Sequence, residues 1–198
     1  MAEVILNGKT FKHSKKYLKD LIVEVENDRR LITKLKANNQ ALDTKKPESL
    51  NLSLSDFDSI EIDTSSTLDL AIDAIDSCSK YIQHVTQKIQ SLIELYAKND
   101  TENANILFNE VLETLDLFIQ LVAKIYKTLK LYYPKTIIKS RTIQDLEIHL
   151  LSVLKALLPA KEKNDIIMLQ DLLEYELMDN LTQWKIKALP ELKNYHQV

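Results

Sequence analysis

Residues 68–96, LDLAIDAIDSCSKYIQHVTQKIQSLIELY, place an apolar or small residue at alternating intervals of three and four positions. The residues that share this spacing are Leu68, Ala71, Ile75, Cys78, Ile82, Val85, Ile89, Leu92 and Tyr96. An α-helix brings positions with this spacing onto one side, so the segment predicts an amphipathic helix that packs against other helices. Ser66 and Asp69 predict its start as a capping box in which aspartate replaces the usual glutamate or glutamine.

The same spacing returns in three later segments. Its members are Phe108, Val111, Leu115, Phe118, Val122, Ile125, Leu129 and Tyr132, then Ile143, Leu146, Leu150, Val153 and Leu157, then Ile166, Leu169, Leu173, Leu177, Leu181, Trp184 and Ala188. We expect four helices, at about 66–98, 102–131, 142–158 and 161–189, with Pro159 and Pro190 ending the last two. A connection as short as Asn99-Asp100-Thr101 forces antiparallel neighbours, so residues 64–198 predict an antiparallel four-helix bundle.

Residues 1–63 show short strand-like runs separated by turn signals instead of long helical periods. Asn7-Gly8, with the only glycine of the chain, and Asn38-Asn39 each separate two such runs and predict hairpins. Between the hairpins, a helix from Ser14 to about Asn27 is expected. Its predicted inner face consists of Tyr17, Leu18, Leu21, Ile22 and Val25. A final strand is expected at the end of the segment LSDFDSIEI, residues 54–62.

This order of hairpin, helix, hairpin and strand resembles the β-grasp fold of ubiquitin-like proteins. The segment at 54–62 is similar to the closing pattern Leu-x-Asp-Gly-Asp-x-Ile-x-Ile of small bacterial sulfur carriers, with Phe57 where those proteins have glycine. Sulfur carriers act through a free Gly-Gly end, whereas this strand continues into Asp63-Thr64-Ser65-Ser66. The resemblance therefore implies the fold and a surface for docking, without carrier chemistry. The predicted fold class is α+β and predominantly α, with a β-grasp-like domain at 1–63 and a four-helix bundle at 64–198.

Composition limits the classes of function. The chain has 198 residues, 45% of them hydrophobic, and a net charge of −3, which gives no overall basic field for nucleic acid. Lysines 9, 12, 15, 16 and 19, with His13, would need interleaved aromatic residues to form a nucleic-acid site, and only Phe11 and Tyr17 are candidates, so a solvated face is the expected reading. No uncharged apolar run is long enough to span a membrane. The single cysteine, Cys78, excludes an intrachain disulfide, and we expect an intracellular, cytoplasmic protein of bacterial type.

No catalytic, cofactor-binding or metal-binding residues are predicted. His149 lacks the neighbouring lysine and glycine of a histidine phosphotransfer site, and Glu147 stands two positions away, not three as in di-iron bundles. Asp69, Asp73 and Asp76 share a helix face, for which a solvated acidic surface is the expected reading. No Gly-x-Ser-x-Gly elbow occurs, and Cys78 is expected to be buried.

One dense segment predicts a protein-binding surface: Asp171, Glu174, Tyr175 and Trp184. Asp171 and Glu174 are neighbours on one helix face, and Glu174 adjoins the apolar seam, where a half-buried carboxylate would need a hydrogen-bond partner. An exposed or structurally paired acid is the other interpretation. For Trp184, a position in the core near the end of the bundle is the favoured interpretation.

The expected function is a non-catalytic adaptor, assembly factor or chaperone that binds another protein through a groove of the bundle or an edge of the β-grasp sheet. An alternative is an enzyme or metal-binding protein in which Asp171, Glu174 and His149 converge on a pocket between the domains. A homodimer that uses the wide apolar surface of the second long helix is also possible. The adaptor predicts an exposed apolar groove or patch, and the enzyme predicts converging carboxylates.

Overall fold

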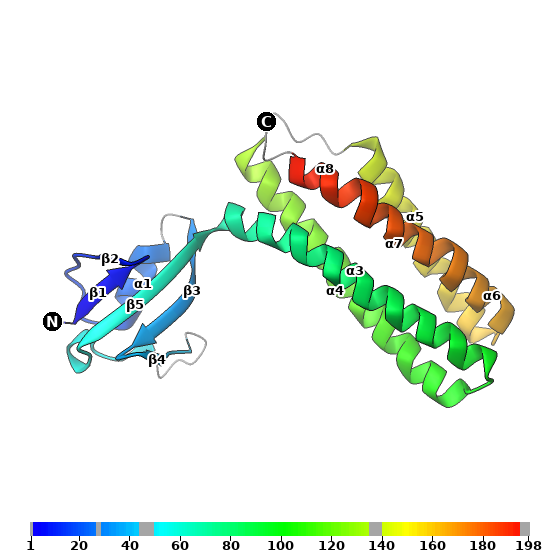
Figure 1. Cartoon of the computed structure of the whole chain (residues 1–198), viewed down its shortest axis with the longest axis horizontal. Coiled ribbons are helices and arrows are strands. Elements are labelled where there is room, and N and C mark those ends of the chain that lie inside the picture. The colour runs from blue at the N-terminus through cyan, green and yellow to red at the C-terminus, as the bar shows by residue number, and fades with distance from the viewer. Residues whose placement is uncertain (1, 27–28, 44–49, 135–139, 195–198) are drawn as a thin grey trace. The chain divides into compact units, whose positions relative to one another are not determined.

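A computed structural model describes residues 2–26, 29–43, 50–134 and 140–194 (Figure 1). The chain divides into two compact units, Met1–Leu70 and Ala71–Val198. Among the described residues, the first unit contains a small sheet, the helix α1 (Leu18–Glu26) and the first turn of α3 (Thr67–Ala97), and the regular structure of the second unit is helical. No helix among the described residues combines the length and apolar content needed to cross a membrane.

The sheet of the first unit has five strands in the order β2-β1-β5-β3-β4. Their bounds are β1 Glu3–Leu6, β2 Lys9–Thr10, β3 Arg30–Ala37, β4 Gln40–Ala41 and β5 Ser59–Ser66. The last strand in sequence, β5, lies in the middle, parallel to β1 and antiparallel to β3. A short 3₁₀ turn, η1 (Leu54–Asp56), precedes it.

Both predicted hairpins are confirmed, and asparagine makes each possible. Asn7 and Gly8 have φ angles of 49° and 76°, and Asn38 and Asn39 have φ angles of 48° and 65°. Two consecutive positive φ angles define the type I′ turn, whose twist matches that of antiparallel strands. Asn38 also accepts backbone hydrogen bonds from Asp58 and Ser59, which ties the second hairpin to the start of β5.

The helix α1, Leu18–Glu26, begins four residues later than predicted from Ser14. The preceding segment pairs with another part of the chain instead: Tyr17 forms a β-bridge with Ser53, and the Leu18 amide donates to the Leu52 carbonyl. Tyr17 is therefore 46% exposed rather than part of the core. The other residues of the predicted inner face are buried, namely Leu18, Leu21, Ile22 and Val25.

A β-bulge changes which side chains of β3 face the core. The pairing of β3 with β5 shifts register between Ile32 and Lys34, so Thr33 is an extra residue opposite β5. Beyond the shift, Leu35 and Ala37 are buried as the alternation predicts, but before it Ile32 packs on the core and Leu31 is 45% exposed.

The strand β5 extends beyond residue 63, where the sequence pattern predicts the domain boundary, because its last residues pair with the beginning of β3. The helix α3, Thr67–Ala97, starts at the next residue. The Ser66 hydroxyl accepts the Asp69 amide at 3.0 Å and donates to the Asp69 carboxylate at 2.7 Å. The predicted cap is therefore present, and Ser66 is both the last strand residue and the helix cap.

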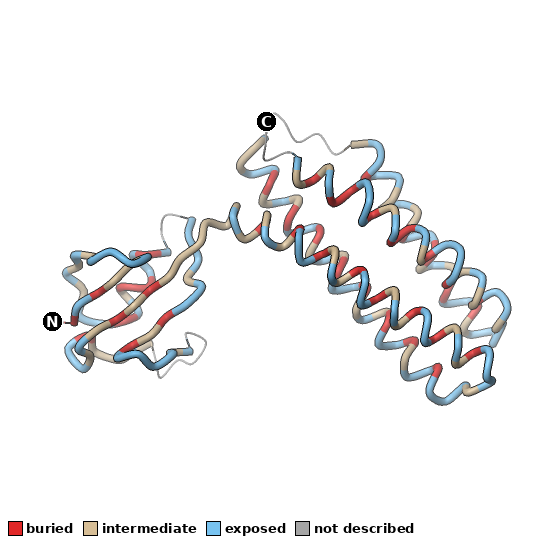
Figure 2. Tube along the Cα trace, in the orientation of Figure 1, coloured by how far each residue is buried: buried red, intermediate tan, exposed pale blue. Residues whose placement is uncertain are grey.

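Three further helical stretches follow α3. They are α4 (Thr101–Tyr132), α5 (Arg141–Glu162) and a final stretch made of α6 (Ile166–Asp171), η2 (Leu172–Leu177), α7 (Met178–Gln183), η3 (Trp184–Ala188) and α8 (Leu189–Asn194). The predicted seams are buried almost throughout, and Figure 2 shows buried residues recurring along each helix. The exceptions, Leu68, Tyr132, Leu146 and Ile166, are half-buried.

Two helix reversals use the same dipeptide. Asn99 and Asn164 adopt positive φ angles of 57° and 51° and end α3 and α5, and the next residues, Asp100 and Asp165, cap α4 and α6 with their carboxylates. Asp165 donates its amide to the Ala160 carbonyl, five residues earlier, as in a Schellman motif.

The third helix does not end at Pro159, as predicted, but continues to Glu162, and the fourth begins at Ile166 instead of near Lys161. Proline removes only one backbone donor in this last turn. Leu157 and Ala160, on either side of it, are buried and hold the turn in place.

The final stretch contains two π-helical segments, η2 and η3. The Met178 amide donates to the Leu173 carbonyl, and the Leu189 amide donates to the Trp184 carbonyl, each five residues back. Such segments are rare and recur at functional sites.

Side-chain contacts connect the four helical stretches in a closed series, in which Lys161 of α5 donates to Asn105 of α4. Lys88 of α3 pairs with Glu110 of α4 at 2.8 Å, and His149 of α5 meets Glu176 of η2 at 2.9 Å. Lys193 of α8 returns to Asp76 of α3 at 2.6 Å.

We expect substitution of Gly8 to weaken the first hairpin through backbone conformation alone, because a Cβ at this position would meet no atom within 4 Å. Gly8→Val should cost about 1–2 kcal/mol, and Gly8→Asn clearly less, since asparagine tolerates the left-handed region. Urea unfolding followed by the amide resonances of β1 and β2 measures both. Equal costs for the two variants would contradict the assignment.

Burial raises the pKa of the Cys78 thiol from 9.0 to about 11. Because the folded state keeps this proton to higher pH than the unfolded chain, its stabilising contribution is lost between pH 9 and 11, by about 2 kcal/mol. The free energy of unfolding, measured across this range, should fall more steeply for the native protein than for Cys78→Ala. Parallel pH profiles would contradict the prediction.

Candidate functional site

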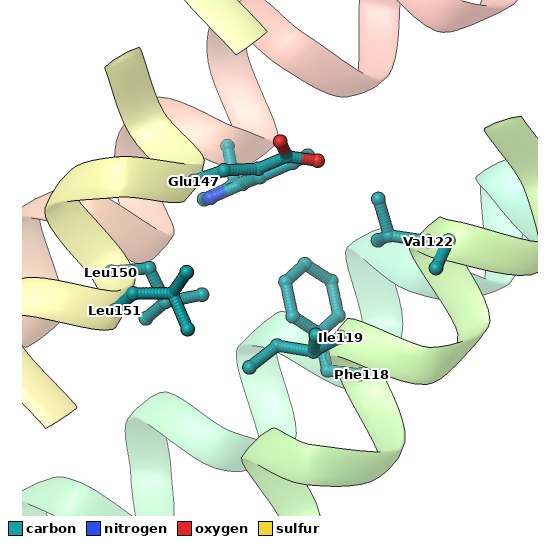
Figure 3. A pocket seen from close by; sticks show the side chains of 8 residues that line it. Phe118, Ile119, Val122, Glu147, Leu150 and Leu151 are labelled. Atoms are coloured by element: carbon teal, nitrogen blue, oxygen red, sulfur yellow. The ribbon is translucent and has the colours of Figure 1, made fainter. Parts of the chain in front are cut away.

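An apolar pocket of about 120 Å³ lies between α4, α5 and η3. Its lining consists of Phe118, Ile119, Val122 and Ala123 from α4, Glu147, Leu150 and Leu151 from α5, and Trp184 from η3. Figure 3 shows the labelled α4 and α5 side chains facing one another across the space. We call this feature the Trp184 pocket. Its lining has one ionisable side chain, Glu147, so contact with apolar groups is what it can offer.

The pocket lies within a longer row of apolar side chains. Leu151 and Leu158, two turns apart on α5, are 50% and 53% exposed, and Leu154 between them is half-buried. On α4, Ile119 lines the pocket and Leu112 lies two turns before it, also half-buried. We call these five residues the α4–α5 apolar stripe. Their seven-residue spacing on both helices suits an apolar face with helical periodicity.

Trp184 forms the inner wall of the pocket. It is not on the surface, although the sequence analysis included it in a predicted protein-binding surface. It is 1% exposed, and its ring meets Phe118 edge to face, with centroids 5.7 Å apart and planes at 89°. Its Nε1 atom is buried and has no hydrogen-bond partner among the described residues. Trp184 is thus a core residue that reaches the wall of a pocket, and the favoured interpretation of its role is confirmed.

The other residues of the predicted surface lie elsewhere. Asp171, Glu174 and Tyr175 are all exposed, so Glu174 is not the half-buried acid that its neighbours in the seam suggested. Asp171 and Tyr175 line a shallow hollow together with Met168, Leu172 and Glu176, and Glu174 is not part of it. The structure therefore joins two of the four predicted residues and places Trp184 in a different pocket.

His149 has partners that the sequence analysis missed. Its Nε2 lies 2.9 Å from Glu176 Oε2, and its Nδ1 lies 3.1 Å from Nδ2 of the fully buried Asn180. Asn180 Nδ2 also donates to the Leu146 carbonyl at 3.0 Å. Since the asparagine amide is the donor, Nδ1 accepts and Nε2 carries the proton toward Glu176. The available signal was the position of Asn180, three residues after Leu177 on an otherwise apolar seam.

A second missed cluster surrounds Lys161 at the end of α5. Its ammonium lies 5.4 Å from the ring centroid of Tyr96 and 5.3 Å from that of Phe108. It donates to the Tyr96 hydroxyl at 3.2 Å and to the Asn105 side chain. Burial lowers the pKa of the Lys161 ammonium and raises the pKa of the Tyr96 phenol. The cluster joins α3, α4 and α5 through one cation held between two aromatic rings.

Within the described part of the chain, no group of three or more histidine, cysteine or acidic side chains could hold a metal ion. The acid that reaches His149 is Glu176, and the structure shows no convergence of His149 with Asp171 or Glu174. The chemistry that the geometry supports at the Trp184 pocket is therefore apolar contact.

Taken together, the second unit is a helical module with an apolar pocket in its wall. A family model described as "Domain of unknown function (DUF8042)" matches residues 73–187, and the chain belongs to this family. The match includes every residue of the Trp184 pocket, and it does not reach the sheet. No curated protein and no solved structure matches the chain.

We expect Lys161→Met to lower the free energy of unfolding by about 1–2 kcal/mol, because methionine keeps the apolar stem but loses the attraction to both rings. Lys155→Met, on the exposed side of the same helix, should change it by less than about 0.5 kcal/mol. Urea unfolding followed by circular dichroism compares the two variants. Equal effects would show that the charge of Lys161 contributes nothing specific.

Proposed function

We propose that the protein is a non-catalytic adaptor or assembly factor that binds another protein through the α4–α5 apolar stripe. The observation that supports this most directly is the Trp184 pocket, an apolar hollow with the half-exposed Leu151 at its side. Buried apolar anchors carry most of the energy of protein interfaces. A partner segment that covers Leu151 and Leu158 and fills the pocket would remove this surface from water.

The proposal includes two finer statements about the fold. We propose that the first unit is a β-grasp domain, supported by the strand order β2-β1-β5-β3-β4 with a helix between the two hairpins. We propose that the second unit is an antiparallel four-helix bundle, supported by contacts that link its helical stretches in a closed series. A chaperone for a helical substrate is a specific form of this function.

The partner that we propose is an amphipathic helix, because the stripe repeats every seven residues on both α4 and α5. A second copy of this chain could offer such a helix, so the same surface would serve a homodimer. We place the interaction in the cytoplasm, and the buried free thiol of Cys78 is compatible with this location. The carboxylate-pocket alternative lacks support from the positions of Asp171 and Glu174.

A photo-crosslinking amino acid at Leu151 tests the proposal. The full-length protein with p-benzoylphenylalanine at this position, irradiated in the cells that produce it, should form a covalent adduct with a distinct protein. Leu151→Asp in the same chain should weaken binding of the identified partner at least tenfold, since a charge would enter an apolar contact. Ile186, 57% exposed on η3, provides the matched control for both crosslinking and substitution.

Each result has a definite meaning. An adduct at Leu151 and none at Ile186 supports docking on the stripe. An adduct between two copies of the chain would support the homodimer and contradict the adaptor proposal. No adduct at Leu151, or equal adducts at both positions, would refute docking on this surface.

A further inference from the structure

A separate hollow of about 420 Å³ lies in the first unit, beside the turn of the first hairpin. It is lined by Leu6 and Asn7 from β1 and its turn, Lys9, Thr10 and Phe11 from β2 and the following residue, and Arg30 at the start of β3. We propose that this hollow binds a small organic oxyanion, a carboxylate or phosphate carried on a compact apolar body. This inference goes beyond the proposed function, which uses the helical unit only.

The first argument is the charge balance of β3. Four cationic side chains occur in residues 29–36, and the two later ones lie opposite carboxylates of β5. Lys34 pairs with Asp63 at 3.5 Å, and Lys36 lies opposite Glu61 in the strand register. Arg30, in contrast, lies opposite Ser66. Its charge therefore remains without a neighbouring carboxylate in the strand pairing.

The second argument is that Lys9 brings another cation to the same hollow. Among the residues that the structure describes, neither Lys9 nor Arg30 forms an ion pair within 4 Å. Two unpaired cations from different strands, β2 and β3, therefore line one space. Such a pair raises the local concentration of anions and favours a ligand with negative charge.

The third argument is that the backbone around the two cations is held in place. The Asn7 side chain donates to Thr64 Oγ1 at 2.9 Å and accepts the Thr64 amide at 2.8 Å, which attaches the hairpin turn to β5. On the other side, the Arg29 carbonyl accepts the Thr67 amide at 3.2 Å and holds the start of β3. The backbone beside both cations is thus held by hydrogen bonds to β5 and to the first residue of α3.

The lining also determines the rest of the ligand. Leu6 and Phe11 are half-buried and pack against the core of the first unit, so they give the hollow an apolar floor. The guanidinium of Arg30 can bind two oxygens of one carboxylate or phosphate, and the Lys9 ammonium adds a compact charge. An inorganic anion alone would leave the floor exposed to water. A benzoate-sized body with one oxyanion uses both parts.

Amide NMR titration of the full-length protein with four probes tests the inference: benzoate, phenyl phosphate, benzyl alcohol and benzylamine. We expect benzoate and phenyl phosphate to shift the resonances of Lys9, Thr10 and Arg30 and to bind at least about fivefold more tightly than benzyl alcohol. Benzylamine should shift none of them. Added salt should weaken the binding of both anions, since screening shortens the range of their electrostatic attraction to Lys9 and Arg30.

Substitutions separate the two cations from general surface charge. Lys9→Gln and Arg30→Gln should each weaken benzoate binding about fivefold, while Lys34→Gln, on the same strand but paired with Asp63, should change it less than twofold. All three positions are exposed, so the variants should fold, and their amide spectra provide the check. Tighter binding of phenyl phosphate than of benzoate would identify phosphate as the preferred oxyanion.

Three results would overturn the inference. They are no shift of these resonances at about 10 mM probe, equal affinity for benzoate and benzyl alcohol, and an equal loss in Lys34→Gln. None of them bears on crosslinking at Leu151, which lies in the other unit, so the two proposals fail independently.

Discussion

The helical unit depends on two reversals of the chain, each completed within a connection of three residues, 98–100 and 163–165. In each, an asparagine takes the left-handed conformation that ends one helix, and the following aspartate accepts the first free amides of the next. Such a connection is too short to carry the chain far from the end of the first helix, so the second helix returns beside the first. The apolar seams then meet along their length, which allows Leu92 and Leu115 to be fully buried.

The buried residues of this unit could be predicted from their apolar spacing, because a helix places every third and fourth residue on one side regardless of its partners. The errors occurred where a distant contact outweighs a local preference. Proline favours a helix end, but Leu157 and Ala160 are both buried and carry the helix past Pro159. Asn164-Asp165 repeats the signal of Asn99-Asp100 and would have located the next helix correctly.

In the first unit, the turns were predictable because asparagine and glycine act through their own backbone. It was less predictable which side chains of the strands face the core. An extra residue at Thr33 reverses the alternation, and nothing in the strand itself announces a bulge that depends on pairing with β5. The candidate site was harder still, since Ile119, Leu151 and Trp184 come from three separate elements. Single-helix patterns identify none of their mutual contacts, and the same holds for His149 with Asn180.

The family match begins at residue 73, inside α3, whereas the helix itself begins directly after β5. The border of the family match thus lies within regular secondary structure and not in a loop. Each residue inserted into a continuous helix rotates everything beyond it by about 100° and advances it by about 1.5 Å. An insertion or deletion after Ser66 would therefore rotate every seam residue of α3 around the helix axis relative to the capping residue that begins the helix.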